Sequence, residues 1–464
     1  MKFIKIIVLC MCTMFSCAQS LAQPPIVWDT ITGVQGTSSD VVYDVKEYEN
    51  IFYFTGIGTG RGSGIDAQYW VLDSTGQEVL YSVYGDKEKR NSCNELIPYS
   101  DSSWLMLINE HSVDIHLIEL HHNGDTVRTI RFDDLAEAFT YRFAGAFSQN
   151  TGALVLTGHS KISGDPTIAI LPKTLDTVIF KKFNMMMQGT IPESIAPVTS
   201  GGFILAGTDY LLKLNDQGDS VNAYRFTGTG IISKIIALEN GDFAVTGTRP
   251  DTMRPVGSPL VPVLFIFDKN LNLLNTHWWG IEAQKLNYSV SINSINEIPN
   301  GQGFILSGSK RGPDVPPFSG YLAKLEQNGD LGWEYVDSAS TLRPNIKFWD
   351  AIPTSDGGYV VCGQQGDFQY AARFARDTSI FLTSIKEPLL LDFQVFPNPA
   401  SDYITFQSGE PVDVTLFDLK GKLIQRYSFQ REKIVDISAL AQGMYIYKAI
   451  SRKGLVARGK FIKQ

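Results

Sequence analysis

A short pattern of hydrophobic and polar positions recurs through most of the chain. It consists of an apolar strand, a turn rich in Gly, Asn and Asp, and a second apolar strand that ends in glycine. The clearest copies are VTSGGFILAG, ALENGDFAVTG, IPNGQGFILSG and PTSDGGYVVCG, with final glycines Gly207, Gly247, Gly308 and Gly363. Weaker copies end at Gly56 and Gly158, and YSDSSWLMLI at 99–108 is a further copy without the glycine. Because glycine tolerates the left-handed backbone of tight turns, each copy predicts an antiparallel hairpin.

A second hairpin follows each copy, as in VLDSTGQEVL, KLNDQGDSVN and KLEQNGDLGW. The two hairpins together give four strands in every 40 to 60 residues. A repeat of this length and strand number is typical of a β-propeller blade. We therefore predict an all-β fold with a seven-bladed β-propeller, six or eight blades being the alternatives. The blades are expected to begin near residues 41, 91, 141, 189, 230, 287 and 347.

One strand-like segment, IVWDTITG at 26–33, precedes the first blade, and the last blade lacks an obvious fourth strand. We expect the first segment to complete the last blade, because this pairing would cover two open sheet edges.

The C-terminal region has a different pattern. Alternating apolar residues in VFPNPASDYITF, VTLFDLKGKLI and IVDISALAQGMYIYKAI, separated by turn signals, predict a small Ig-like β-sandwich over 395–464. The predicted organisation is a propeller domain at 23–386, a linker at 387–394 and the sandwich. Residues 395–464 contain 11 Lys and Arg against 6 Asp and Glu, although the whole chain has a net charge of −8. A basic tail therefore follows an acidic propeller.

Several landmarks of this tail occur together and in order. They are Pro397, Asn398 and Pro399, a strand turn ending at Gly421, a second turn with Gly443 and Tyr445, and a terminal strand that begins at Lys460. The tail resembles the type A C-terminal sorting domain of type IX secretion cargo. The resemblance implies the type IX translocon as a partner, with export through the periplasm to the cell surface or beyond. The repeats resemble the glycine-rich propeller repeats of secreted proteins of Bacteroidetes type, which is informative about fold rather than function.

The N-terminal segment 1–22 is interpreted as a signal peptide. Lys2 and Lys5 precede a short apolar stretch, and small residues precede a cleavage position after Ala22. Acylation of Cys17 is the alternative, although Met14-Phe-Ser16 is a poor match to a lipobox. Cleavage leaves Cys93 and Cys362, both in apolar strand contexts, and they are interpreted as small buried hydrophobic residues rather than a disulfide.

Composition and charge exclude several classes of protein. With 44% hydrophobic and 19% charged residues, the chain is too apolar to be disordered. The acidic balance argues against nucleic-acid binding, which requires a basic surface. The apolar stretch near the N-terminus is too short to cross a bilayer, so no transmembrane segment is expected.

Ligand binding is expected at the end of the propeller that has the long connections. Long segments occur at 57–66, 249–262 and 310–320, between the second and third strands of three blades. Loops on a rigid scaffold are common recognition sites. The candidate ligand face comprises Arg61, Arg249, Arg254, Arg311, Arg343, Trp278 and Trp279. Arginine and tryptophan together suit a carboxylated sugar, and the alternative is that these residues are dispersed around a wide rim.

Motifs for catalysis are missing. There is no His-Glu-x-x-His pair, Gly-x-Ser-x-Gly elbow or phosphate loop. We therefore predict no catalytic residues, no metal and no cofactor. The preferred function is a non-catalytic, exported scaffold that binds a glycan or a protein. The alternative is a secreted polysaccharide hydrolase or lyase, whose paired carboxylates the sequence alone cannot identify.

Overall fold

The computed structural model describes residues 23–32, 40–58, 65–85, 91–110, 114–131, 144–159, 165–183, 192–227, 231–250, 260–279, 289–312, 315–337, 345–376, 393–417, 423–451 and 456–464. The chain divides into two compact units, Met1–Asp377 and Thr378–Gln464. Strands dominate both units, and no helix occurs in these ranges. Within them, nothing helical is long and apolar enough to cross a membrane.

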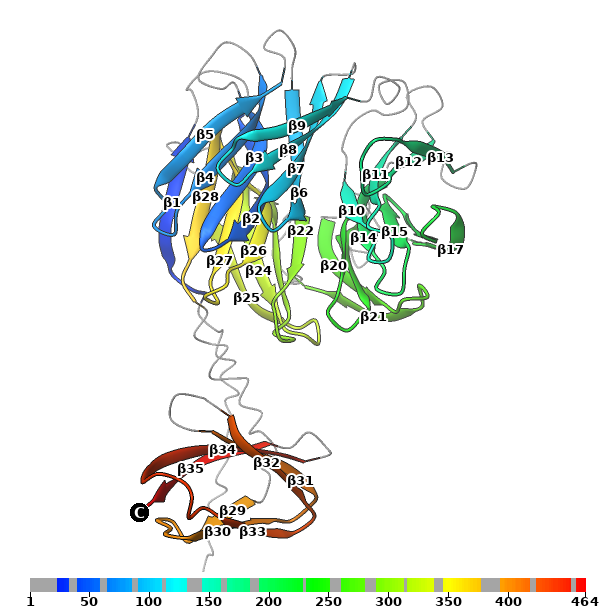
Figure 1. The fold of residues 1–464 in the computed structure, drawn as a ribbon. Coiled ribbons are helices and arrows are strands. Elements are labelled where there is room, and N and C mark those ends of the chain that lie inside the picture. The colour runs from blue at the N-terminus through cyan, green and yellow to red at the C-terminus, as the bar shows by residue number, and fades with distance from the viewer. Residues whose placement is uncertain are drawn as a thin grey trace, which may run out of the picture. The chain divides into compact units, whose positions relative to one another are not determined.

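The described part of the first unit forms seven four-stranded antiparallel sheets, which we call blades 1 to 7 (Figure 1). Blade 1 contains β2 (Val41–Tyr48), β3 (Ile51–Gly58), β4 (Asp66–Leu72) and β5 (Glu78–Tyr84). Blade 2 contains β6 (Asn91–Ser100), β7 (Ser103–Glu110), β8 (Asp114–His121) and β9 (Thr126–Arg131). Blade 3 contains β10 (Gly145–Phe147), β11 (Leu154–His159), β12 (Pro166–Leu171) and β13 (Ile179–Lys182). Blade 4 contains β14 (Pro192–Pro197), β15 (Phe203–Gly207), β16 (Tyr210–Leu214) and β17 (Ser220–Arg225).

The remaining blades follow the same order, except for the last. Blade 5 contains β18 (Ile231–Ala237), β19 (Phe243–Pro250), β20 (Leu260–Phe267) and β21 (Leu273–Trp278). Blade 6 contains β22 (Ser289–Glu297), β23 (Phe304–Gly312), β24 (Val315–Leu325) and β25 (Leu331–Asp337). Blade 7 contains β26 (Ile346–Pro353), β27 (Tyr359–Gln365), β28 (Phe368–Phe374) and, as its fourth strand, β1 (Ile26–Thr32). The N-terminal strand therefore closes the last blade, as predicted, and Thr30 pairs with Ala371 in this ladder.

Each pair of neighbouring blades encloses its own hydrophobic cluster. Blade 1 and blade 2, for example, share the cluster of Tyr53 and Tyr69 with Leu96 and Trp104. The cluster between blades 7 and 1 joins Val360 and its neighbours to Phe52 and Trp70. The other five interfaces between neighbouring blades each have such a cluster as well. Both faces of every sheet are thus packed, which explains why the strands are more uniformly apolar than in an open sheet.

The second hairpin of blade 4 has the turn chemistry that the sequence indicated. Gly218 has a φ of 77°. The side-chain oxygen of Asn215 accepts hydrogen bonds from the backbone amides of Gln217 and Asp219 at 3.0 and 2.8 Å. An Asx turn followed by a left-handed glycine holds the two strands in register.

The described part of the second unit contains two sheets that pack face to face. One has the strand order β29 (Phe393–Phe396), β30 (Tyr403–Ser408) and β33 (Glu432–Asp436). The other has the order β32 (Leu423–Phe429), β31 (Val412–Phe417), β34 (Gly443–Ser451) and β35 (Val456–Lys463). Ile404 and Phe406 of the first sheet share one buried cluster with Val414 and Phe461 of the second. The tail is therefore a small sandwich with its own core.

Candidate functional site

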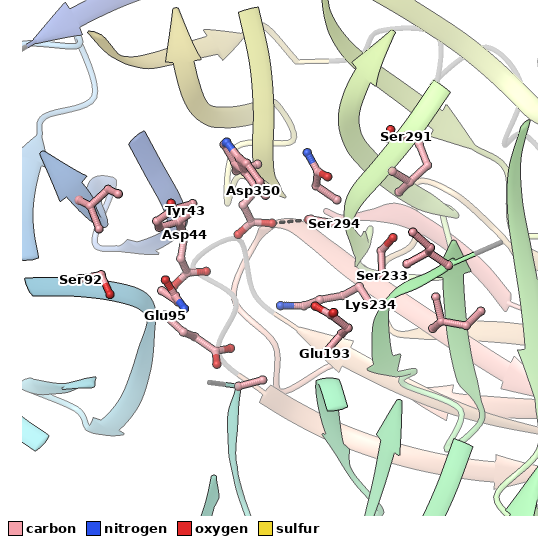
Figure 2. A pocket seen from close by; sticks show the side chains of 18 of the residues that line it. Tyr43, Asp44, Ser92, Glu95, Glu193, Ser233, Lys234, Ser291, Ser294 and Asp350 are labelled. Atoms are coloured by element: carbon pink, nitrogen blue, oxygen red, sulfur yellow. Dashed lines mark hydrogen bonds between the residues drawn. The ribbon is translucent and has the colours of Figure 1, made fainter. Parts of the chain in front are cut away.

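A central cavity of about 750 Å³ lies inside the ring of blades (Figure 2). Its wall is formed mainly by the first strands of the blades, at positions such as Asp44, Lys234 and Asp350. The ends of second and third strands, including Thr248 and Leu260, also line it. The cavity therefore reaches the end of the propeller at which these second and third strands are joined. We call it the funnel.

Backbone bulges determine which side chains line the funnel. In six of the seven blades, the pairing of the first strand with the second shifts register, at one place in five of them and at two places in blade 2. A bulge turns its extra residue out of the regular alternation of the strand. The residues at these shifts are Tyr43, Asn94, Glu193, Ser233, Asn293 and Trp349, and all of them line the funnel.

The repeated glycine of the sequence has a physical reason at these bulges. Gly363 pairs with Phe348, the residue immediately before the bulged Trp349. A Cβ atom on Gly363 would lie 1.9 Å from the carbonyl oxygen of Lys347. Gly56, Gly247 and Gly308 meet a carbonyl of their first strand in the same way, at 1.9 to 2.2 Å. The glycine therefore marks the bulge, and the bulge marks a funnel residue on the neighbouring strand.

Residues that follow the bulges join several of the blades to the next. Asp44 accepts a hydrogen bond from the backbone amide of Leu96 at 2.8 Å. Glu95 accepts one from the amide of Gly145 at 2.9 Å. Blade 6 reaches blade 7 in the same way, since Ser294 donates to Asp350. These charged and polar side chains thus form part of the ring's construction as well as the wall of the funnel.

A cluster of charges lies in the middle of the funnel, and Figure 2 shows Asp44, Lys234 and Asp350 converging from different blades. Asp44 of blade 1 and Asp350 of blade 7 form a carboxyl pair, and Lys46 contacts Asp44 at 2.6 Å. Burial raises the pKa of Asp44, the ammonium of Lys46 opposes this, and the charge of Asp350 adds to it. Burial also acts to raise the pKa of Asp350, but Lys46, Lys234 and hydrogen bonds outweigh it and lower that pKa. The pKa values of the two carboxyl groups are therefore driven apart, with that of Asp44 the higher.

Two aromatic bulge residues stand beside this carboxyl pair. The rings of Tyr43 and Trp349 meet edge to face, with centroids 5.3 Å apart. The indole Nε1 of Trp349 is shielded from solvent and has no hydrogen-bond partner among the described residues. Buried polar groups in native proteins are usually paired, so this unpaired indole N–H is an exception, and it belongs to a residue that lines the funnel.

The predicted ligand-face residues are only partly brought together. The guanidinium of Arg249 stacks on the ring of Trp278 at 4.6 Å, and the side chain of Trp278 is 49% exposed. Arg311 lies at the same end of blade 6. Trp279 is instead buried in the core, where its indole donates to the hydroxyl of Tyr321 at 3.0 Å. Arg61, Arg254 and Arg343 lie outside the described residues.

The segment 310–320 also differs from the expected long loop. β23 continues to Gly312 and β24 begins at Val315, so most of this segment belongs to one long hairpin. The prolines and glycines that indicated a loop are tolerated because a register shift interrupts the ladder between Lys310 and Gly312.

The funnel itself was not predicted from the sequence. Its wall contains Asn, Ser and Thr side chains together with Glu95, Glu193 and the carboxyl pair, and none of its described lining residues is an arginine. Among the described residues, no group of three or more His, Cys, Asp or Glu side chains is arranged to hold a metal ion. Cys93 and Cys362 are buried free thiols, as expected, and burial raises the pKa of Cys93 to about 12.

In the tail, the separate sequence landmarks meet at one place. Asn398 donates to the carbonyl of Lys460 at 3.1 Å and accepts from the amide of Ile462 at 3.0 Å. The ring of Tyr445 stacks on that of Phe461 in the last strand, with centroids 5.5 Å apart. Gly443 pairs with Lys463, whereas Gly421 lies outside the described residues. Asn398 and Tyr445 of the motif therefore help to fix the final strand in the sandwich.

Residues 394–464 match the family described as the secretion system C-terminal sorting domain. This domain makes the chain a type IX secretion cargo and directs it to the cell surface or the extracellular space. A search of curated proteins finds no match to the chain.

Several solved structures resemble the chain at low sequence identity. The Pan2 WD40 domain of Neurospora crassa is 9% identical, with a TM-score of 0.48, over 77% of this chain and 97% of that one. Virginiamycin B lyase from Staphylococcus aureus is 9% identical, with a TM-score of 0.48, over 75% of this chain and 99% of that one. A protein of unknown function from Bacteroides caccae is 10% identical, with a TM-score of 0.38, over 65% and 94% of the two chains.

Proposed function

We propose that this type IX secretion cargo is a non-catalytic binding protein that holds a glycan in the funnel of its propeller. Residues 1–22 would act as its signal peptide, and the tail would engage the type IX translocon after passage into the periplasm. Attachment at the cell surface or release would then present the propeller to its ligand outside the cell.

The unpaired indole N–H of Trp349 is the observation that carries this proposal. It lies beside Tyr43 in a cavity whose volume, about 750 Å³, is within the usual range for small-molecule sites. A sugar offers hydroxyl oxygens that accept from an indole N–H, together with an apolar ring face that packs on an aromatic side chain. Asn91, Asn109 and Ser291 add neutral donors and acceptors to the wall.

The test is a screen of the purified chain against a glycan array and, in parallel, against polysaccharides assayed for released product. We expect binding without product. Trp349→Phe keeps an aromatic ring but removes the N–H, and should weaken glycan binding roughly tenfold, the equivalent of one lost hydrogen bond to a buried group. Trp70→Phe is the matched control, because the indole nitrogen of Trp70 is also buried without a partner, but in the cluster between blades 7 and 1.

Binding that Trp349→Phe leaves unchanged would contradict this assignment of the site. Failure of the unaltered protein to bind any glycan would contradict the proposal as a whole and would direct attention to a protein ligand.

A secreted polysaccharide hydrolase is the second candidate, and the carboxyl pair favours it. Acid and base chemistry needs two carboxyl groups whose pKa values are driven apart, and Asp44 and Asp350 are shifted in opposite directions. If the screen detects product, Asp350→Asn should abolish its release while leaving glycan binding in place. Product release that survives Asp350→Asn would exclude this pair as the catalytic groups.

A further inference from the structure

Three cations at the end of blades 5 to 7 where the funnel opens each lie over an aromatic ring. Arg249 lies 4.6 Å from the ring centre of Trp278. Arg311 and Lys347 lie 5.7 and 4.2 Å from the ring centre of Phe318. We call these five residues the cation strip.

The cations of the strip have no carboxylate partners among the described residues, which separates them from other arginines of the propeller. Arg128 pairs with Glu119, Arg225 with Asp209, and Arg373 with Asp356. The acid near the strip, Glu334, instead lies 4.0 Å from Lys310 and accepts from the hydroxyl of Tyr321. Within the described part of the chain, three positive charges thus stand without an acidic partner on a domain whose overall charge is negative.

The chain places the strip along the border of the funnel. Arg249 and Arg311 are the next-to-last residues of β19 and β23, the second strands of blades 5 and 6. Thr248, beside Arg249, lines the funnel, as does Trp349, two residues after Lys347. A ligand that enters the funnel from this end therefore passes blades on which these cations lie.

Stacking suits these groups to carboxylates carried on rings. A guanidinium that lies flat on an aromatic face keeps its N–H edge free for a two-pronged contact with a carboxylate. The half-exposed ring of Trp278 offers an apolar surface for a sugar face next to that contact. Successive cations on three blades match a ligand with repeated charges rather than a single small anion.

We propose that the cation strip binds an acidic polysaccharide, a chain of sugar rings that bear carboxylates. This inference deepens the proposed function, on which it rests for the class of ligand, by adding the carboxylate as the recognised group. Its residues are not those of the funnel wall, so the two proposals can fail separately.

Polygalacturonate is the probe for the test, and its fully methyl-esterified form is the matched ligand control. Binding to the full chain is measured by titration calorimetry at low and at physiological salt. We expect polygalacturonate to bind and the ester to bind at least tenfold more weakly, because esterification removes the carboxylates and keeps the rings. Dextran sulfate is a second control, because it is a charged polysaccharide without carboxylates, and its binding measures attraction by charge alone.

Arg249→Lys and Arg311→Lys keep the charge but remove the planar fork, and each should weaken polygalacturonate binding roughly tenfold. Arg225→Lys is the matched control, because this exposed arginine lies outside the strip and is paired with Asp209. Unchanged melting temperatures of the variants confirm that they fold.

Equal binding of the ester, equal affinity of the lysine variants, or no binding of polygalacturonate would each overturn the inference. A further outcome is that the lysine variants bind dextran sulfate and polygalacturonate as tightly as the unaltered protein does. In that case the strip would be only a general anion-binding surface. Loss of neutral-glycan binding in Trp349→Phe with polygalacturonate binding intact would show the funnel and the strip to be independent.

Discussion

At the scale of single residues, Gly363 is required by a backbone bulge in the neighbouring strand, β26. It lies opposite Phe348, and its missing side chain leaves room for the carbonyl that precedes the bulge at Trp349. The glycine is therefore needed for close approach, not for a special φ angle, since it is absent from the positions with positive φ. The bulge in turn directs Trp349 into the funnel.

Replacing this glycine is expected to be costly. In Gly363→Ala the new methyl group would lie 1.9 Å from the carbonyl oxygen of Lys347, so the two strands must separate. We expect a loss of about 1–3 kcal/mol in the free energy of unfolding, measured by urea denaturation. Gly301→Ala is the control, because nothing lies within 4 Å of its added methyl group, and its cost of about 1 kcal/mol comes from a φ of 67° alone. Equal losses in the two variants would contradict the steric explanation.

The Asp44 carboxyl predicts a defined dependence of stability on pH. Burial raises its pKa from 3.8 to about 7 in the folded protein, which therefore retains a proton that the unfolded chain releases. The resulting stabilisation is complete below about pH 4 and is lost as the pH rises through 7.

Asp44→Asn should remove this dependence. The stability of the unaltered protein relative to the variant is expected to fall by up to about 1.4 kcal/mol for each pH unit between pH 4 and 7. Urea denaturation of both proteins across that range measures the difference. Parallel profiles would mean that Asp44 keeps an ordinary pKa in the folded state.

Residue patterns predicted strands and turns better than the directions of side chains. Trp278 and Trp279 are neighbours in the sequence, yet one is half exposed under Arg249 and the other is buried against Tyr321. Trp278 is the last residue of β21, where it pairs with Val263, whereas Trp279 follows the end of the strand, and a linear pattern does not give this boundary. The glycine repeat contained the signal for the bulges, but its meaning depends on a register that the sequence does not state.

At the scale of elements, β1 is the strand that closes the ring. It pairs with β28 from Ile26 to Thr32, and the backbone amide of Ala375 extends this pairing to the carbonyl of Pro25. Trp28 of β1 also donates to the carbonyl of Ser74 in blade 1. The same strand therefore completes blade 7 and contacts its neighbour.

Deleting residues 23–34 should lower the melting temperature of the propeller by about 10 °C. The deletion removes several ladder hydrogen bonds, each worth about 1 kcal/mol, and exposes the edge of β28. Differential scanning calorimetry of the full chain and the deletion variant measures the shift. A mutant with Trp28→Phe, which loses only the indole bond, should show a shift of at most a few degrees. An unchanged melting temperature in the deletion variant would contradict a closing role.

Hairpins inside the blades were predictable because their turns have strong local signals. The first strands begin at Val41, Asn91, Ile231 and Ser289, close to the expected starts. The segment 310–320 was not predictable in the same way, because its prolines and glycines occur at a ladder irregularity instead of a loop. A bulge and a loop have similar composition, and the partner strand distinguishes them.

At the scale of the whole molecule, the tail has a core of its own and a final strand held by Asn398. In Asn398→Ala, the amide of Ile462 and the carbonyl of Lys460 both lose a partner. We expect amide hydrogen exchange of the last strand to accelerate by at least tenfold, consistent with a loss of about 1–3 kcal/mol. Mass spectrometry of peptides from residues 456–464 measures this exchange.

Gln407→Ala is the control for this variant, because Gln407 is exposed in the same sandwich. Exchange in the final strand should be unaffected by it. Equal exchange in the Asn398→Ala and unaltered proteins would mean that the motif is not a structural clamp.

The tail was recognisable from the sequence because its landmarks occur in order within about 70 residues, and Asn398 and Tyr445 among them contact the same final strand. The funnel was not, since Asp44 and Asp350 are separated by most of the chain and meet only when the ring closes. Their chemistry depends on burial and on each other's charge, and neither is visible in a linear pattern. The sequence thus indicated the destination of the protein more directly than its binding site.

Closure by β1 also has a mechanical consequence. The last described strand before the tail, β28, lies between β1 and β27 and is hydrogen-bonded to both. Tension applied through the tail would enter the propeller along this strand and load two ladders in shear at the same time. Hydrogen bonds that are loaded together resist a pulling force far better than hydrogen bonds that open one after another. A cargo held at its C-terminus would therefore transmit drag to its most firmly fastened strand.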